Sequence, residues 1–283
     1  MSVAGPQLAA IDQEAPDAPE RFVASLRETG FGVLRNHSLD ASLVERIYRD
    51  WAAFFASAEK RDYYFDRETH DGWFPPEVSE IARGQAEKDI KEYFHYYPQG
   101  RCPAHLRADL QRYHAAAEAI ATRLLGWAER LSPPAVAARY AEPLSGMIEG
   151  SASTLLRILH YPSLGGGEPA GAIRAAAHED INLLTILPAA SAPGLQVLDR
   201  NGRWLDVSCD FGNLIVNVGD MLQEVTGGWL PSTTHRVVNP AGSGEGARMS
   251  LPLFLHPRSE VVLSERYTAG AYLRERLAEL GVL

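Results

Sequence analysis

Cysteine is nearly absent from this chain of 283 residues, which has only Cys102 and Cys209, and they do not form a CxxC pair. We therefore expect neither a disulfide framework nor a cysteine-bound zinc site, and the low thiol content suits a reducing compartment. The opening MSVAGPQLAAIDQEAPDAPE lacks the basic region and the apolar run of a signal peptide. No apolar stretch approaches the ~20 residues of a membrane span. The sequence predicts a cytoplasmic protein without a membrane partner.

Positive charge is also in short supply. Lys and Arg number 27 against 36 Asp and Glu, so the formal net charge is -9 and the sequence pI is about 5.5. Because nucleic-acid-binding domains usually carry a basic face, we expect no nucleic-acid partner. A local basic pocket for a small anion is compatible with this balance. The sequence makes no prediction of the oligomeric state.

Helical periodicity is concentrated in the first half of the chain. We predict helices within residues 19–30, 38–57, 104–131 and 133–144, and Asp40 is a candidate N-cap of the second. Residues 59–103 are aromatic and aperiodic, which is typical of segments that line sites. After Gly150 come at least eight short β-favouring stretches bounded by Gly, Pro, Asn and Ser, MLQEVT among them.

These elements predict one unit, residues 1–283, of the α+β class, mainly β with flanking helices. A mostly helical N-terminal region would span residues 1–149, a β core 150–260, and a C-terminal helix 261–283. Short, closely spaced strands favour an antiparallel sandwich or barrel with helices packed outside.

His178 and Asp180 stand two positions apart at the start of HEDINLLTIL. On a strand end both side chains would point to the same face, although an exposed polar pair at a loop has the same spacing. His235, which begins HRVVNP, adds a third candidate if its strand returns beside the first. Two imidazoles and a carboxylate on one face form the facial triad of non-haem Fe(II) sites. A structural zinc more often has four protein ligands, so a set of three favours a catalytic metal site over a structural one.

Arg248 and Ser250 lie two positions apart in the apolar run ARMSLPLFL. A buried arginine needs a partner, and its planar fork suits a carboxylate, to which Ser250 could donate a second hydrogen bond. A protein Asp or Glu is one candidate partner. Beside a candidate iron site, an acidic cosubstrate is the favoured one.

Other residues near these motifs are expected to be structural. His160 would point to the opposite face of its strand from Tyr161. Asn217 and Asp220, in NVGD, would shape a turn rather than contact substrate. Apolar residues are expected to surround the metal, among them Leu183, Ile186, Leu195, Val216 and Leu253.

Several segments occur in a characteristic order: TGFGVLRNHSLD, DGWFPP, DIKEYFHY, LRILHYP, HEDINLLTIL, GLQVLDRNGRW, NVGDMLQEVTGGWLPSTTHRVVNP and RMS. In these segments, which are spread from residue 29 to residue 250, the chain resembles the iron- and 2-oxoglutarate-dependent dioxygenases of the isopenicillin N synthase type. The resemblance implies a double-stranded β-helix, or jelly-roll, core at residues 150–260. It also implies Fe(II) as cofactor, 2-oxoglutarate as cosubstrate and O2 as oxidant.

The resemblance further implies iron ligands His178, Asp180 and His235, and contacts to the distal carboxylate of 2-oxoglutarate from Arg248, Ser250 and Tyr161. Two departures concern the neighbourhood of the site. Leu159 replaces an Asn of many plant members, and residues 226–228 read Thr-Gly-Gly instead of Ser-Asn-Gly. Related halogenases have Gly or Ala at the position of Asp180, so halogenation is not expected.

The expected activity is oxidation of an unactivated C–H bond in a small molecule, by hydroxylation, desaturation or cyclisation, with release of succinate and CO2. A role in secondary metabolism follows by analogy with the family. Candidate substrate contacts, each equally compatible with packing or a surface charge, are Phe74, Tyr93, His95, Tyr97, Arg101, Tyr267 and Arg274. The alternatives are an iron oxidase of the same family that needs no 2-oxoglutarate, and a non-catalytic jelly-roll module that holds a metal.

Overall fold

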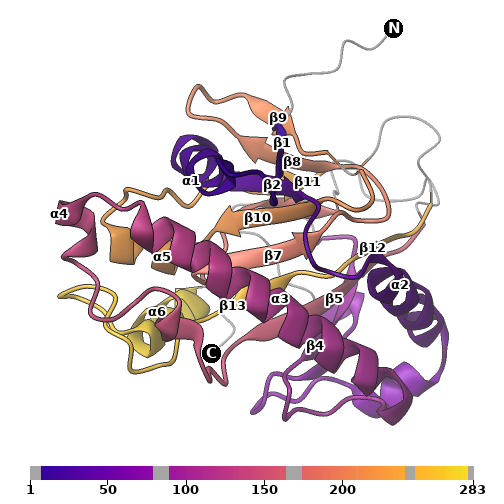
Figure 1. The fold of residues 1–283 in the computed structure, drawn as a ribbon. Helices are drawn as coiled ribbons and strands as arrows, with labels where there is room; N and C mark the ends of the chain where they lie inside the picture. Colours follow the sequence, from indigo (N-terminus) through magenta and orange to yellow (C-terminus); the bar gives the residue numbers. More distant parts are fainter. Residues whose placement is uncertain (1–7, 79–88, 164–173, 209, 240–245, 280–283) are drawn as a thin grey trace, which may run out of the picture.

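The computed structural model describes residues 8–78, 89–163, 174–208, 210–239 and 246–279 (Figure 1). Within them, a large sheet and a small sheet face each other, and helices cover the outer side of the large sheet. The ends of the predicted N-terminal region and of the predicted C-terminal helix, residues 1–7 and 280–283, lie outside the described residues.

The larger sheet draws its strands from both halves of the chain. They are β1 (Ala10–Asp12), β2 (Phe31–Arg35), β3 (Gly72–Phe74), β4 (Glu92–Tyr96), β5 (Leu155–Tyr161), β7 (Leu184–Pro188), β10 (Leu214–Val218), β12 (Arg248–Ser250) and β13 (Leu253–Leu255). The order is β1-β2-β10-β7-β13-β5-β4-β3, with β12 also paired to β5. Only β1 and β2 are parallel among these pairs.

The smaller sheet contains β6 (Ala175–His178), β8 (Leu195–Leu198), β9 (Trp204–Asp206) and β11 (His235–Val237), in the order β6-β11-β8-β9. Its apolar side chains meet those of β2, β7 and β10 in one buried cluster that includes Phe31, Val33, Leu187, Val197, Ile215 and Val237. We call the side of the larger sheet that faces the smaller one its inner face. Apolar burial between two sheets disfavours water in this interior.

The opposite side of the larger sheet packs against helices. The helices are α1 (Ala18–Thr29), α2 (Ala41–Ala56), α3 (Ala104–Arg130), α4 (Pro134–Ala137), α5 (Asp220–Thr226) and α6 (Ala269–Glu279), with 3-10 turns η1 (Glu59–Tyr63), η2 (Pro76–Val78) and η3 (Gly146–Ile148). Figure 1 shows the long α3 running across this layer. Asp40 caps α2 as predicted, because its carboxylate accepts from the Ser42 amide at 2.9 Å.

Three structural predictions need correction. MLQEVT is not a strand but helix α5, because the amides of Asp220 and Met221 bond to the carbonyls of residues 180–182, and Gly227 ends the helix with a φ of 63°. The helix predicted at 133–144 shortens to the four residues of α4. The segment 59–103 is not aperiodic throughout, because it contains strands β3 and β4. All residues of both strands are buried, so their sequences show no alternation of apolar and polar residues.

The apolar residues expected around the metal also divide differently. Ile186, Val216 and Leu253, like Leu183, belong to the core that includes the helices, whereas Leu195 lies between the sheets. A strand buried on both sides carries apolar residues on both, so the sequence pattern does not say which side faces the site.

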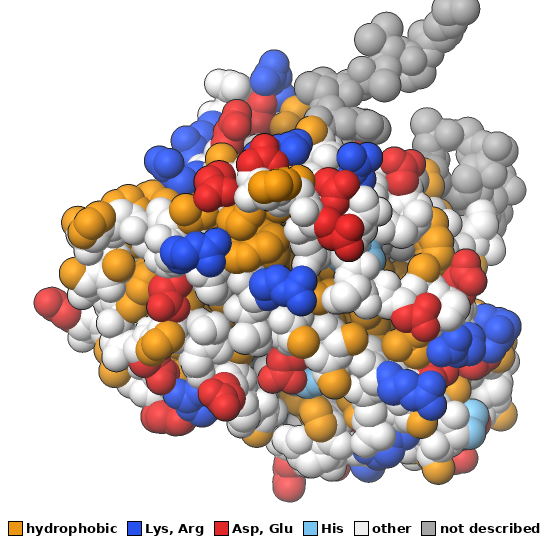
Figure 2. Space-filling view, viewed as in Figure 1, with side chains coloured by type: hydrophobic (Ala, Val, Ile, Leu, Met, Phe, Trp, Pro, Cys, Tyr) orange, Lys and Arg blue, Asp and Glu red, His pale blue; other side chains and the backbone are white. Residues whose placement is uncertain are grey.

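The jelly-roll architecture itself is confirmed, and the division at residues 150 and 261 stays a prediction. In the described part of the chain, no helix combines the length and apolar character needed to cross a membrane. Figure 2 shows acidic and basic side chains interspersed over the face drawn there.

Candidate metal and cosubstrate site

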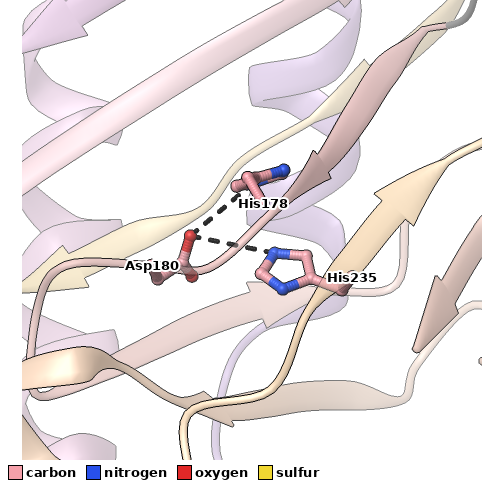
Figure 3. Close-up of side chains that lie close together, drawn as sticks. All are labelled: His178, Asp180 and His235. Carbon is pink, nitrogen blue, oxygen red and sulfur yellow. Dashed lines mark ion pairs between the residues drawn. The ribbon is translucent and has the colours of Figure 1, made fainter. Parts of the chain in front are cut away.

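Three side chains converge where β6 ends and β11 begins in the smaller sheet (Figure 3). His178 ends β6, Asp180 lies in the loop that follows, and His235 begins β11. Nε2 of each histidine lies 3.8 Å from Oδ1 of Asp180. The candidate ligand atoms all lie within 4.8 Å of one another, and within the described ranges no other group of His, Cys, Asp and Glu does so.

Strand register explains the convergence. His178 and His235 are directly opposite each other in the antiparallel pair of β6 and β11, and side chains opposite each other share a face. Each ring donates through Nδ1 to a carbonyl two residues earlier, His178 to Ala176 at 2.8 Å and His235 to Thr233 at 3.1 Å. These bonds place the ring proton on Nδ1 and leave both Nε2 lone pairs free to bind a metal.

Asp180 is held by a buried polar network. Its Oδ2 accepts from the Thr185 hydroxyl at 2.5 Å and from the Asn217 amide at 2.8 Å, while Asn182 donates to the same Thr185 oxygen at 3.0 Å. Oδ1 therefore stays turned toward the imidazoles. Asn217 thus lies in strand β10 and bonds to Asp180, so the expectation that it shapes a turn is wrong.

Two opposing effects set the charge of Asp180. Burial raises its pKa, but the imidazoles of His235 and His178, with the bonds from Thr185 and Asn217, outweigh burial and lower the pKa below the ordinary value. Desolvation, followed by repulsion from His235, lowers the pKa of His178. Both shifts favour the protonation states that bind a divalent metal, a carboxylate and a neutral imidazole.

Arg248 lies on the inner face, opposite Tyr161, with its guanidinium carbon 5.1 Å from the centre of the tyrosine ring. It is 2% exposed, and Nε donates to the Ala192 carbonyl at 3.0 Å. Nη1 is buried and has no hydrogen-bond partner, and no carboxylate pairs with this arginine among the described residues. The protein Asp or Glu considered as an alternative partner is therefore not found there.

Ser250 also faces inward, opposite Leu159, the residue that replaces the Asn of many plant relatives. A small hollow reaches Arg248, and its other walls include Leu187, Leu195 and Ile215. An unpaired buried guanidinium at the end of an apolar hollow fits a carboxylate. The residues present thus fit both an Fe(II) ion at the triad and 2-oxoglutarate beside it.

The inner face continues from this site into a cluster of rings. Phe74 lies opposite Tyr93, and Tyr93 lies opposite Leu159, so these side chains share the face of Ser250. Phe74 and Tyr93 stack with centroids 4.8 Å apart. Two of the residues proposed from sequence for substrate contact, Phe74 and Tyr93, are thus brought to the inner face.

His95 lies on the same face, opposite Arg157. Arg157 donates through Nε to His95 Nε2 at 2.9 Å, and its guanidinium lies 4.7 Å from the Tyr93 ring and 5.4 Å from the Phe254 ring. Phe254 in turn lies opposite Thr185, which contacts Asp180. A chain of neighbouring side chains therefore links the triad to Arg157, which the sequence-based set did not include.

The remaining substrate candidates have other surroundings. Arg101 forms an ion pair with Asp71 at 2.9 Å, and Tyr267 donates to Glu275 at 2.8 Å. Arg274 is exposed on α6. Tyr97, partly buried just after β4, is close enough to Arg157 for its pKa, raised mainly by burial, to be affected. His160 points away from the site as expected, since it bonds to Glu92 at 2.8 Å.

Sequence reasoning missed Arg174 and the roles of Thr185 and Asn217. Arg174 is fully buried just before β6, at 0% exposure. Thr185 and Asn217 are single polar residues inside the apolar strands LTILP and LIVNV. A lone polar residue in a buried strand is a usable signal, because it needs a hydrogen-bond partner.

A jelly-roll core with two histidines and a carboxylate is an arrangement typical of non-haem iron oxygenases. Comparison with known proteins agrees. Residues 152–257 match the model of the 2OG-Fe(II) oxygenase superfamily, and residues 7–115 match the N-terminal model of non-haem dioxygenases in morphine synthesis. Proline hydroxylase buaE of Petromyces alliaceus is 30% identical, over 92% of this chain and 88% of its own.

Solved structures show the same relationship. A provisionally assigned oxygenase from Shewanella oneidensis is 58% identical, with a TM-score of 0.90 over 98% of this chain and 100% of its own. A full-length Neurospora crassa protein, solved in complex with alpha-KG (2-oxoglutarate), shares the fold at 21% identity, with a TM-score of 0.79 over 96% of both chains. The chain belongs to the 2OG-Fe(II) oxygenase superfamily, as the resemblance implied. It is an Fe(II)- and 2-oxoglutarate-dependent dioxygenase.

Proposed function

We propose that this enzyme hydroxylates an unactivated C–H bond of a small molecule. Substrate, 2-oxoglutarate and O2 would give hydroxylated substrate, succinate and CO2, with one oxygen atom in each of the first two products. The observation that carries the proposal is the pairing of a His-Asp-His triad with a buried Arg248 that has no carboxylate partner among the described residues. The triad would bind a metal, and Arg248 would bind an anion.

In this proposal His178, Asp180 and His235 hold Fe(II), and Arg248, Ser250 and Tyr161 hold the distal carboxylate of 2-oxoglutarate. Bound iron supplies the activation of O2 that amino-acid side chains cannot provide. The protein positions the reactants and excludes water. The apolar cluster between the sheets would help to exclude water.

The inner face supports a small substrate with both a flat or apolar part and a polar part. Phe74, Tyr93 and Phe254 offer ring surfaces, and the guanidinium of Arg157 places a positive charge beside two of them. The names of relatives are compatible with a small substrate. Proline hydroxylase buaE is named for an amino acid, and the Neurospora crassa protein has been solved with thymine. Fungal relatives named as 2-oxoglutarate-Fe(II) type oxidoreductases fit a role in secondary metabolism.

The test is turnover by the full chain, reconstituted with Fe(II) without oxygen and then mixed with O2 and 2-oxoglutarate. Candidate substrates are proline, other amino acids and pyrimidine bases. We expect one of them to stimulate succinate formation and to gain one oxygen atom by mass spectrometry. Asp180→Ala is the control and should form no product while keeping its circular dichroism spectrum.

Two results would contradict the proposal. Iron-dependent substrate oxidation without succinate would indicate the oxidase that needs no 2-oxoglutarate. Absence of turnover with every candidate, together with no binding of 2-oxoglutarate to the metal-loaded protein, would indicate the non-catalytic metal-binding module.

A further inference from the structure

Arg174 is a second buried guanidinium at the cosubstrate end of the site. It immediately precedes β6, the strand that ends in His178, and its side chain has no access to solvent. Nη2 donates to the Gly246 carbonyl at 2.7 Å. Nε and Nη1 are buried and find no hydrogen-bond partner in the described part of the chain.

The contact with Gly246 places Arg174 beside the segment that leads into Arg248. Gly246 stands two residues before Arg248, which itself lies opposite Tyr161. The two arginines are electrostatic neighbours. Burial, and after it the charge of Arg248, lowers the pKa of Arg174, while Tyr161 acts in the opposite direction. The cosubstrate end of the site therefore holds two cationic side chains close together.

Two buried like charges without a counter-charge are costly. Three guanidinium nitrogens, Nε and Nη1 of Arg174 and Nη1 of Arg248, lack partners in the described residues. No ion pair with Asp or Glu is found for either arginine among these residues. A carboxylate has two oxygens and about four lone-pair sites, so it can accept hydrogen bonds from two guanidinium groups.

We propose that Arg174 is a second anchor for the distal carboxylate of 2-oxoglutarate, which it would hold together with Arg248. This rests on the proposed function and adds a residue to its cosubstrate site. Arg174 would then help the enzyme to distinguish dicarboxylic 2-oxo acids from monocarboxylic ones, because only the former carry a carboxylate at that end. The residue would position the cosubstrate without touching the reacting atoms.

The experiment measures equilibrium binding, so it does not depend on turnover. Full-length protein loaded with Mn(II), which replaces Fe(II) without reacting with O2, is titrated with 2-oxoglutarate by calorimetry. We expect Arg174→Met to weaken binding ~10- to 100-fold, which is the range for losing hydrogen bonds to a charged group. Arg174→Lys, which keeps the charge, should fall between Arg174→Met and the natural protein.

Pyruvate is the matched ligand, because it keeps the metal-chelating 2-oxo acid but lacks the distal carboxylate. Its affinity should be the same in the natural protein and in Arg174→Met. Arg203→Met, which removes a positive charge from an exposed side chain paired with Asp199, controls for net charge. Its affinity for 2-oxoglutarate should be unchanged.

The outcomes separate this inference from the proposed function. If Arg248→Met weakens 2-oxoglutarate binding but both Arg174 variants bind as tightly as the natural protein, the second anchor is refuted and the proposed function stands. If Arg174→Met weakens pyruvate equally, Arg174 supports the site as a whole and the inference is again wrong. If the natural protein binds no 2-oxoglutarate, both proposals fail. Should Arg174→Met not fold, Arg174→Lys decides by the same comparison.

Discussion

The hydrogen bonds to Oδ2 of Asp180 should control metal affinity. Asp180 is 7% exposed, and Thr185 and Asn217 both donate to the same oxygen. A hydrogen bond to a charged group is worth about 1.5–3 kcal/mol. Asn217→Leu, which keeps the size of the side chain but removes its donor, should therefore weaken metal binding ~10- to 100-fold, the usual effect of losing a residue that orients a ligand.

Thr185→Val should have a comparable effect, because Asn182 already donates to the Thr185 oxygen and the hydroxyl proton is thus committed to Asp180. Either substitution should also raise the pKa of Asp180, which these bonds help to lower. Metal binding should consequently be lost at a higher pH than in the natural protein when the solution is acidified.

Calorimetric titration with Mn(II) at several pH values measures both effects. Asn201→Leu is the matched control, because the Asn201 side chain is exposed. The reasoning would be refuted if Asn217→Leu and Thr185→Val destabilised the protein to urea yet bound Mn(II) as tightly as the Asn201 variant. In that case the bonds would support the fold and not the ligand.

Three further predictions follow from the same structure. Burial lowers the pKa of His256 from 6.5 to about 4, so the unfolded chain takes up a proton on this residue below pH 6.5 and the folded protein does so only near pH 4. The free energy of unfolding should therefore fall as the pH is lowered from 6.5 toward 4. In urea unfolding of the metal-free protein, this fall should be about 2–3 kcal/mol smaller for His256→Asn, and an equal fall would contradict the prediction. Phe74→Ala should raise the substrate KM roughly 2- to 10-fold through lost ring contacts, without changing the affinity for 2-oxoglutarate; a change in both would place Phe74 in a general packing role. Mn(II) at 100 times its Kd should raise the free energy of unfolding by about 2.7 kcal/mol. The same concentration should raise that of Asp180→Ala far less. An equal increase in the two proteins would place the metal elsewhere.

Local patterns were sufficient where neighbouring residues determine the structure. The N-cap at Asp40 and the apolar periodicity of α2 and α3 depend on contacts within a few residues, and these helices form as predicted. MLQEVT favoured a strand locally, yet its first amides bond to carbonyls some forty residues earlier, so tertiary contacts overrode local preference.

Sequence by itself determined which residue types were available to bind a metal and an anion. The spacing of His178 and Asp180, the later His235, and the arginine and serine of RMS were enough to predict a metal site and an anion site, because residue type limits what each can bind. Only the tertiary structure decided which other residues share the site. The register of β3, β4, β5 and β12 brings Phe74, Tyr93 and His95 to the inner face. The fold also buries Arg174 and turns Asn217 toward Asp180. Such contacts join residues far apart in the chain, and cross-strand pairing, which no local pattern encodes, sets their positions.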